Sequence, residues 1–177
     1  PSGRLRYASP SVWCGPVHAL SFSCDGEVLA TGSGPGTVCL WDVRRWEPLR
    51  TFAAERPASG LGPLAAALAW EPAGAVMARH NGRDDALEIL DVPSGRVLRV
   101  LPGGGRQLAC LSWSPDGTRL AVGRRDGKVL GWDMTSDSND PHVMLDAHAG
   151  CVNAVVWQRD SRRLITAGED GKILLWE

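Results

Sequence analysis

The sequence predicts an all-β protein in which one antiparallel sheet unit is repeated four times. An aromatic residue that precedes a turn recurs at Phe22, Trp70, Trp113 and Trp157, in steps of 48, 43 and 44 residues. Between these positions lie runs of four to seven residues rich in Val, Leu, Ala and Trp, separated by Gly, Pro, Asp and Ser. No helical periodicity extends beyond a couple of turns, so the runs indicate strands joined by hairpins.

The third unit shows the expected strands most clearly. Its first run, 107–113, is apolar at nearly every position, which is typical of a strand buried on both faces. Turn sequences follow at Pro115-Asp116-Gly117 and Asp126-Gly127, because glycine tolerates the positive φ that tight turns require. The unit therefore predicts three clear strands and a weaker fourth, at 107–113, 118–122, 128–133 and 142–145.

The other units carry the same signals in the same order. Turns are expected at Cys24-Asp25-Gly26 and Gly34-Pro35-Gly36 in the first unit, Pro93-Ser94-Gly95 in the second, and Asp170-Gly171 in the fourth. An acidic residue also recurs 20 residues after the aromatic residue, or 21 in the second unit, and these residues are Asp42, Asp91, Asp133 and Glu177.

These phrases resemble the repeats of the WD40 (WD-repeat) family. The resemblance is carried by "SCDGEVLATG…GTVCLWD", "SPDGTRLAVG…DGKVLGWD" and "AHAGCVNAVVW…LITAGEDGKILLWE", and it covers residues 3 to 177. It implies a β-propeller whose blades are four-stranded antiparallel sheets, with a Trp-Asp or Trp-Glu pair ending the third strand. The second unit departs from this pattern, since Leu90-Asp91 replaces the Trp-Asp pair.

The resemblance also implies how the chain divides. We expect one propeller region over 1–177, with an outer strand at 3–9 and blades at 10–53, 64–102, 103–146 and 147–177, the last lacking its fourth strand. Rings of this family usually contain seven or eight blades, so four blades are either an arc of a larger propeller or a small closed ring. The absence of an initial Met and the end at Trp176-Glu177 favour the arc.

Four residues of the last unit include the three side-chain types of a catalytic triad, together with a tryptophan. His148, Thr166, Asp170 and Trp176 supply an imidazole, a hydroxyl, a carboxylate and an indole. In WD repeats, residues at these positions form a hydrogen-bonded structural tetrad that ties the strands of one blade together. The resemblance therefore implies a structural role rather than catalysis.

The other units hold only parts of this tetrad. Unit one keeps Thr31 and Trp41, and unit two keeps at most Asp84. Unit three keeps Asp126 and Trp132, with Val122 and Gly104 at the Thr and His positions. We therefore expect unit four to be the most rigid blade and unit two the most irregular.

Composition excludes several classes of function. The net charge of −1 argues against a dedicated nucleic-acid binder, and no apolar run approaches the length of a membrane span. The five cysteines include no C-x-x-C pair, so we expect no metal site and no cofactor. Unpaired cysteines favour a reducing intracellular location, in the cytoplasm or the nucleus.

Propellers of this family mostly act as rigid, non-catalytic scaffolds that bind proteins or peptides, often within multiprotein complexes. The resemblance implies binding on the face formed by the loops before the first strands and the turns between the second and third strands. We call these residues the loop face: His18, Arg83, Gln107, Arg124, Arg125, Asn153 and Glu169.

Two alternatives stay open at this stage. Some WD-repeat proteins carry Trp-Asp-x-Arg and dock onto the propeller adaptor of a cullin-type ubiquitin ligase as substrate receptors; in "LWDVR" the contact residue would be Arg44. The other alternative is a propeller enzyme with a central active site, which neither paired carboxylates nor a metal cluster supports.

Overall fold

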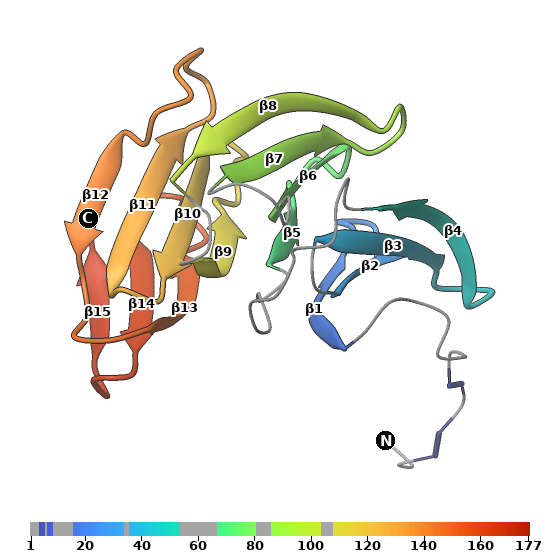
Figure 1. The fold of residues 1–177 in the computed structure, drawn as a ribbon, viewed down its shortest axis with the longest axis horizontal. Coiled ribbons are helices and arrows are strands. Elements are labelled where there is room, and N and C mark those ends of the chain that lie inside the picture. Colours follow the sequence, from blue (N-terminus) through green and yellow to red (C-terminus); the bar gives the residue numbers. More distant parts are fainter. Residues whose placement is uncertain are drawn as a thin grey trace.

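The chain folds into four antiparallel sheets (Figure 1). This computed structural model describes residues 4–5, 7–8, 16–33, 36–53, 67–80, 86–103 and 108–177. The first sheet contains β1 (Val17–Phe22), β2 (Val28–Ser33), β3 (Thr37–Asp42) and β4 (Glu47–Phe52). The second contains β5 (Leu68–Trp70), β6 (Val76–His80), β7 (Ala86–Asp91) and β8 (Arg96–Pro102).

The third and fourth sheets repeat this order. The third contains β9 (Leu108–Trp113), β10 (Arg119–Arg124), β11 (Lys128–Asp133) and β12 (Val143–Asp146). The fourth contains β13 (Val152–Trp157), β14 (Leu164–Gly168) and β15 (Ile173–Trp176). The predicted all-β class and the four-stranded antiparallel unit are confirmed, and no helix in the described part of the chain could cross a membrane.

The sheets stand side by side in chain order, as the blades of a β-propeller do (Figure 1). Their inner strands β1, β5, β9 and β13 pack next to one another in that order. The first and fourth sheets lie at opposite ends of the row, which is therefore an open arc (Figure 1).

The recurring tryptophan of β5, β9 and β13 joins each of these strands to the preceding sheet. The indole Nε1–H of Trp70 donates to the carbonyl oxygen of Ser21 at 3.1 Å. Trp113 donates in the same way to Ala69 at 3.2 Å, and Trp157 to Ser112 at 3.1 Å. The acceptor is each time the residue before the aromatic position of the preceding sheet, so the sequence period reflects a repeated contact between sheets.

The recurring aspartate at the end of the third strand holds the next turn. The Oδ1 of Asp42 accepts the backbone N–H of Arg44 at 2.8 Å, and the Oδ1 of Asp133 accepts that of Thr135 at 2.9 Å. In the second sheet, Asp91 Oδ2 accepts the N–H of Ser94 at 2.9 Å. The second unit therefore keeps the turn-holding aspartate, Asp91, although Leu90 replaces the tryptophan that precedes it in the first and third units.

The expected outer strand at 3–9 stays a prediction. Within this segment the structure describes Arg4, Leu5, Tyr7 and Ala8, and it assigns none of them to a strand. The ring of Tyr7 stacks on Trp46 in the first sheet, with ring centroids 5.7 Å apart.

The turn between the first and second strands of the third sheet is held by a carboxylate. The Ser114 hydroxyl donates to Asp116 Oδ1 at 2.6 Å, and the Thr118 N–H donates to the same oxygen at 3.0 Å. These bonds, the Ser114 hydroxyl foremost, lower the pKa of Asp116 from 3.8 to about 2.

We expect Asp116→Asn to destabilise the protein at neutral pH, and to do so less as the pH falls from 3.8 toward about 2. A carboxyl with a lowered native pKa stabilises the fold above its unfolded pKa, and this contribution disappears as the native carboxyl binds a proton. Urea unfolding of both proteins across this pH range measures the difference. A difference independent of pH would contradict the assignment.

Candidate functional site

The four predicted tetrad residues meet in the fourth sheet. The indole Nε1–H of Trp176, on β15, donates to Thr166 Oγ1 at 3.1 Å. Thr166, on β14, lies 2.9 Å from His148 Nε2, and His148 Nδ1 lies 2.9 Å from Asp170 Oδ1. Because an indole only donates and a carboxylate only accepts, Thr166 donates to Nε2 and the imidazole Nδ1–H donates to Asp170.

The surrounding backbone fixes these side chains. His148 precedes β13, and its side chain and Thr166 are both 0% exposed. Asp170 lies in the β14–β15 turn and accepts backbone N–H groups from Lys172 at 3.1 Å and Ala149 at 3.3 Å. Burial raises the pKa of Asp170, but the hydrogen bonds from His148 and these two N–H groups together lower it below its usual value.

This connectivity also resembles that of a nucleophile, a base and a carboxylate. The Thr166 oxygen, however, is fully buried and already accepts the Trp176 indole N–H. A nucleophile must be able to approach a substrate atom, and no substrate atom can reach this hydroxyl in the folded protein. The hydrogen bonds instead connect β14 and β15 to the segment before β13.

The third sheet uses different partners at the corresponding positions. Val122 offers no acceptor, and the Trp132 indole donates to the carbonyl oxygen of Asn139 at 3.0 Å. Arg124 donates two hydrogen bonds to the Asp126 carboxylate, at 3.1 and 2.9 Å. These bonds are the main reason why the pKa of Asp126 lies below its usual value. The sequence showed that the tetrad was incomplete here but not which groups replace it.

In the second sheet a buried ion pair was missed by sequence analysis. Arg79 donates to one carboxylate oxygen of Glu88 from Nε at 3.0 Å and from Nη2 at 2.8 Å. Arg79 also reaches the carbonyl oxygen of Phe52 in the first sheet at 3.4 Å. The two residues are direct cross-strand neighbours, and only the β6–β7 register could have revealed the pair.

The loop face gathers at one end of the sheets. His18 and Asn153 lie near the starts of β1 and β13, whereas Arg125 and Glu169 follow the ends of β10 and β14; all four are exposed. Arg124 is half-buried and also donates to the carbonyl oxygen of Gly103 at 2.6 Å. Two further members lie outside the described residues, Arg83 and Gln107.

Arg44 lies at the opposite end of the molecule from the loop face, in the turn after β3. Its side chain is 78% exposed and forms an ion pair with Glu27. A pair this exposed contributes little to stability, so the guanidinium can exchange Glu27 for another carboxylate at low cost.

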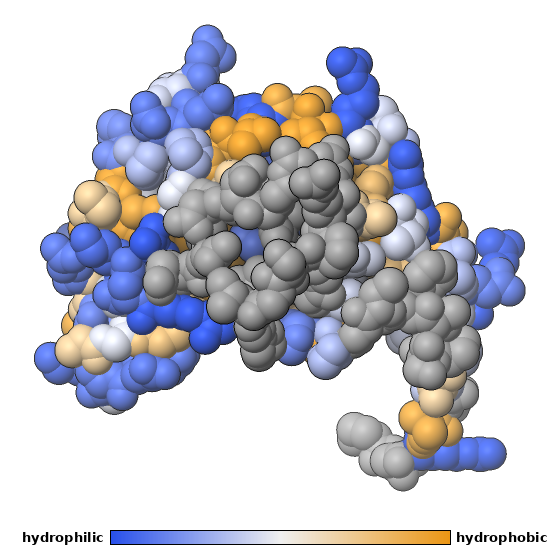
Figure 2. All heavy atoms as spheres, in the orientation of Figure 1, coloured by the Kyte–Doolittle hydropathy of each residue, from blue (hydrophilic) through white to orange (hydrophobic). Residues whose placement is uncertain are grey.

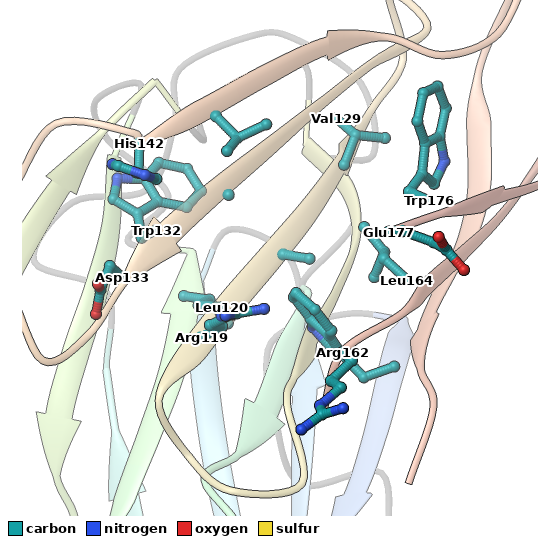
Figure 3. A pocket seen from close by; sticks show the side chains of 14 residues that line it. Arg119, Leu120, Val129, Trp132, Asp133, His142, Arg162, Leu164, Trp176 and Glu177 are labelled. Carbon is teal, nitrogen blue, oxygen red and sulfur yellow. The ribbon is translucent and has the colours of Figure 1, made fainter. Parts of the chain in front are cut away.

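A pocket of about 410 Å³ opens between the third and fourth sheets, also at the end opposite the loop face. Its walls include the rings of Trp132, Trp157 and Trp176, with Arg119 and Glu177 among its charged residues (Figure 3). All three indole N–H groups are already bonded within the protein, so the rings contribute apolar surface.

In the second and third sheets, the residue that follows the third strand packs against a core cluster shared with the preceding sheet. Val92 packs between the first and second sheets, and Met134 packs between the second and third. Outer-strand arginines hold these segments: Arg50 donates to the carbonyl oxygen of Val92 at 3.1 Å, and Arg99 donates to Asn139 Oδ1 at 3.1 Å.

In the third sheet, Val143 takes the cross-strand position of these arginines. Its partner is Gly131, where the first two sheets have the bulkier Leu40 and Ile89. Gly131 and Val143 both line the pocket.

We expect Gly131→Ala to raise the free energy of unfolding by about 0.5–1 kcal/mol, because alanine restricts the unfolded chain more than glycine does. A Cβ at Gly131 would meet only the Cβ of Val143, at an ordinary contact distance of 3.7 Å. Thermal or urea unfolding measures the change. A loss of stability of similar size would show that the pocket cannot accept even one methyl group.

Four side-by-side antiparallel sheets, with their repeated Trp and Asp contacts, define a WD40-type β-propeller region. The family model described as "WD domain, G-beta repeat" matches residues 9–42, 95–133 and 139–177, which is more than half of the chain. The chain therefore belongs to the WD40 family. The matched ranges leave out most of the second unit, where the Trp-Asp pair is missing.

Comparison with individual proteins finds relatives that match most of this chain. The chain is 29% identical over 140 residues to "Protein FIZZY-RELATED 1" of Arabidopsis thaliana, covering 78% of this chain and 27% of that protein. It is 27% identical over 141 residues to "Anaphase-promoting complex subunit cdc20" of Dictyostelium discoideum, covering 78% and 26%. The chain thus spans about a quarter of these relatives' length.

A solved structure shows the same arrangement of sheets. The chain superposes on a protein in "Crystal Structure of Mitotic Checkpoint Complex" with a TM-score of 0.75 and 30% sequence identity. The match covers 90% of this chain and 47% of the other. By their printed names, this neighbour and the cdc20 relative act within multiprotein complexes.

Proposed function

We propose that this chain is part of a non-catalytic protein-interaction scaffold that binds partner proteins or peptides through its loop face. The observation that carries the proposal is the gathering of His18, Arg125, Asn153 and Glu169, all exposed, at one end of three sheets. Paired strands and the tight turns that join them hold these side chains, so a partner can bind without ordering the platform first. Mixed polar and charged groups suit hydrogen bonding to a peptide.

The proposal extends to the tetrad, to the arrangement of the sheets and to the cellular location of the protein. The hydrogen-bonded tetrad of the fourth sheet acts as a structural support for the platform. The four sheets form an arc of a larger ring, and the protein works inside the cell, in the cytoplasm or nucleus. The names of the relatives support membership of a multiprotein complex, and direct contact with nucleic acid or a membrane is not part of the proposal.

Affinity purification with quantitative mass spectrometry tests the loop face. One variant replaces His18, Arg125, Asn153 and Glu169 with alanine. The matched control replaces four exposed polar residues outside the loop face, Asp137, Asp140, Arg159 and Arg162. We expect partners retained by the wild type and the control to be lost from the loop-face variant. Partners lost only from the control would overturn the proposal.

A second candidate is a substrate receptor of a cullin-type ubiquitin ligase. It is favoured by the 78% exposure of Arg44 within the Trp-Asp-x-Arg sequence, and by its position away from the loop face. An adaptor and a substrate could therefore bind at the same time.

Binding of the purified propeller adaptor of such a ligase tests this candidate. Arg44→Ala should weaken binding by at least about tenfold, as expected when one buried charged contact is lost. Arg45→Ala should not, although the Arg45 side chain is 76% exposed and adjacent. Equal adaptor binding by the wild type and Arg44→Ala would remove the candidate.

A further inference from the structure

Two cysteine side chains meet at the contact between the third and fourth sheets. Cys110 lies on β9 and Cys151 directly precedes β13, and these inner strands pack side by side (Figure 1). The Cys110 thiol donates to the carbonyl oxygen of Val152 at 3.4 Å. The Cys151 sulfur lies 3.7 Å from the same oxygen. The two sulfurs are therefore neighbours around one atom, although they come from different repeats.

A missing side chain makes room for the Cys110 sulfur. Gly123 is the cross-strand partner of Cys110, and a Cβ at Gly123 would lie 2.6 Å from this sulfur and 2.7 Å from Val152 Cγ1. The first and fourth sheets have Ala19 and Ala154 at the position of Cys110. The third sheet thus places a reactive group where these two sheets have a methyl group, and it directs this group at the backbone of the fourth repeat.

Charged groups lie beside Cys151. Its backbone N–H donates to Glu169 Oε2 at 3.1 Å, and the charges of Glu169 and Arg125 both act on its thiol. Burial is the main cause that raises the pKa of Cys151 above its usual value, and burial likewise raises the pKa of Cys110 to about 11. Both side chains are nevertheless partly exposed. A small oxidant can therefore reach them, and the raised pKa values make the reaction slow at neutral pH, because the thiolate is the reactive form.

We propose that Cys110 and Cys151 form a reversible disulfide that links the fourth sheet to the third. Each thiol has three staggered rotamers, and the disulfide requires the pair of rotamers that brings the sulfurs to about 2.0 Å. The other described cysteines lie apart from this pair, since Cys24 is exposed in the β1–β2 turn and Cys39 is buried within the first sheet. In a reducing compartment the bond forms transiently, when the oxidant is abundant.

The oxidant is a small-molecule disulfide, such as oxidised glutathione. The Cys151 thiolate attacks one sulfur of this disulfide and releases one glutathione thiolate. The Cys110 thiolate then attacks the Cys151 sulfur and releases the second glutathione thiolate. In each step the departing thiolate takes up the proton that the attacking thiol has lost. Two protein thiols are thereby oxidised, and one oxidised glutathione is reduced to two thiols.

Peptide mapping after oxidation tests the proposal. The folded protein is treated with oxidised glutathione at mildly alkaline pH, free thiols are blocked, and trypsin digestion follows without reductant. We expect disulfide-linked peptides 107–119 and 129–159, whose sole cysteines are Cys110 and Cys151. The oxidised chain should lose the mass of two hydrogens. Absence of the linked peptides, with or without glutathione retained on Cys151, would overturn the proposal, and so would equal yields of every cysteine pairing.

A separate measurement distinguishes the internal bond from cross-links between copies. Figure 2 shows apolar surface along the upper rim, in the region of β8 in Figure 1, where Val97, Leu98 and Val100 are 43%, 55% and 46% exposed. Copies that associate through such a surface can cross-link through the exposed Cys24. The linked peptides should come from protein with the 18.9 kDa mass of one chain. Linked peptides found only in protein of twice this mass would rule out the internal bond.

Cysteine variants give a second readout. Oxidation should raise the Tm of the wild type by several degrees, because the bond closes a long loop of chain, and a dithiol reductant should reverse the shift. Cys110→Ala, which installs the residue found in the first and fourth sheets, and Cys151→Ser should each abolish the linked peptides and the reversible shift. Cys24→Ser is the control and should keep both. A reversible shift that survives in Cys110→Ala, or disappears in Cys24→Ser, would contradict the assignment.

Discussion

Gly127→Ala is expected to lower the free energy of unfolding by about 3 kcal/mol. Gly127 has a φ of +84°, which costs a residue with a Cβ about 1 kcal/mol. Its Cβ would also collide with the carbonyl oxygen of His148 and lie 3.0 Å from that of Gly150. These are backbone atoms of the loop before β13, so relief requires moving the fourth sheet against the third, at a cost of about 2 kcal/mol.

Gly171→Ala is the matched control for this substitution. Gly171 occupies the equivalent turn of the fourth sheet with a φ of +75°, and a Cβ there would meet nothing within 4 Å. We expect a loss of only about 1 kcal/mol, from the backbone conformation alone. Urea unfolding of the two variants measures the difference. Equal losses would contradict close packing of the third sheet's turn against the loop before β13.

Thr166→Val is the second substitution with a large expected effect, also about 3 kcal/mol. Valine has nearly the same shape but removes the hydroxyl that bonds both His148 Nε2 and the Trp176 indole. Two buried polar groups then lose their partner, and each costs about 1–3 kcal/mol. The loss of free energy on denaturant unfolding and the exchange rate of the Trp176 indole proton should both reveal it.

Thr31→Val in the first sheet is the control for the tetrad. Thr31 accepts the indole N–H of Trp41 at 3.0 Å, and position 13, which aligns with the histidine of the tetrad, holds a tryptophan. The expected loss is about 1–2 kcal/mol, from one unsatisfied donor. If Thr31→Val cost as much as Thr166→Val, the histidine and aspartate would add nothing to the tetrad.

The strands of the third unit were predictable because turn chemistry is local. Glycines at the expected turns adopt positive φ, as at Gly117 and Gly127. The expected strand at 118–122 is observed as β10 (Arg119–Arg124), whose last residue, Arg124, still pairs with Leu108 of β9.

Burial was less predictable, because it depends on the neighbouring sheet rather than on the strand itself. The sequences of β1 and β13 share one apolar pattern, yet β1 is largely exposed and β13 contributes to a core cluster. Even β9, expected to be buried on both faces, is buried only at its two ends, Leu108 and Trp113, and is partly exposed between them. The apolar pattern of a strand therefore indicates which side chains can be buried. Whether they are buried depends on which sheet packs beside that strand.

The contacts that replace missing tetrad residues could not be predicted from the sequence either. The absence of threonine at position 122 was visible in the sequence. The acceptor that replaces it, the Asn139 carbonyl oxygen, comes from the loop between β11 and β12. Arg99 of the second sheet also binds this loop. Such contacts depend on where a loop folds in space, which periodicity does not encode.

The contact between consecutive inner strands is the feature on which the fold and the platform both rest. A nuclear Overhauser effect from the indole N–H of Trp113 to the backbone of Ala69 tests it most directly, since these residues belong to different sheets and the N–O distance is 3.2 Å. We predict this signal, with slow solvent exchange of the same indole proton. Rapid exchange and no signal from the second sheet would contradict the side-by-side arrangement of the sheets.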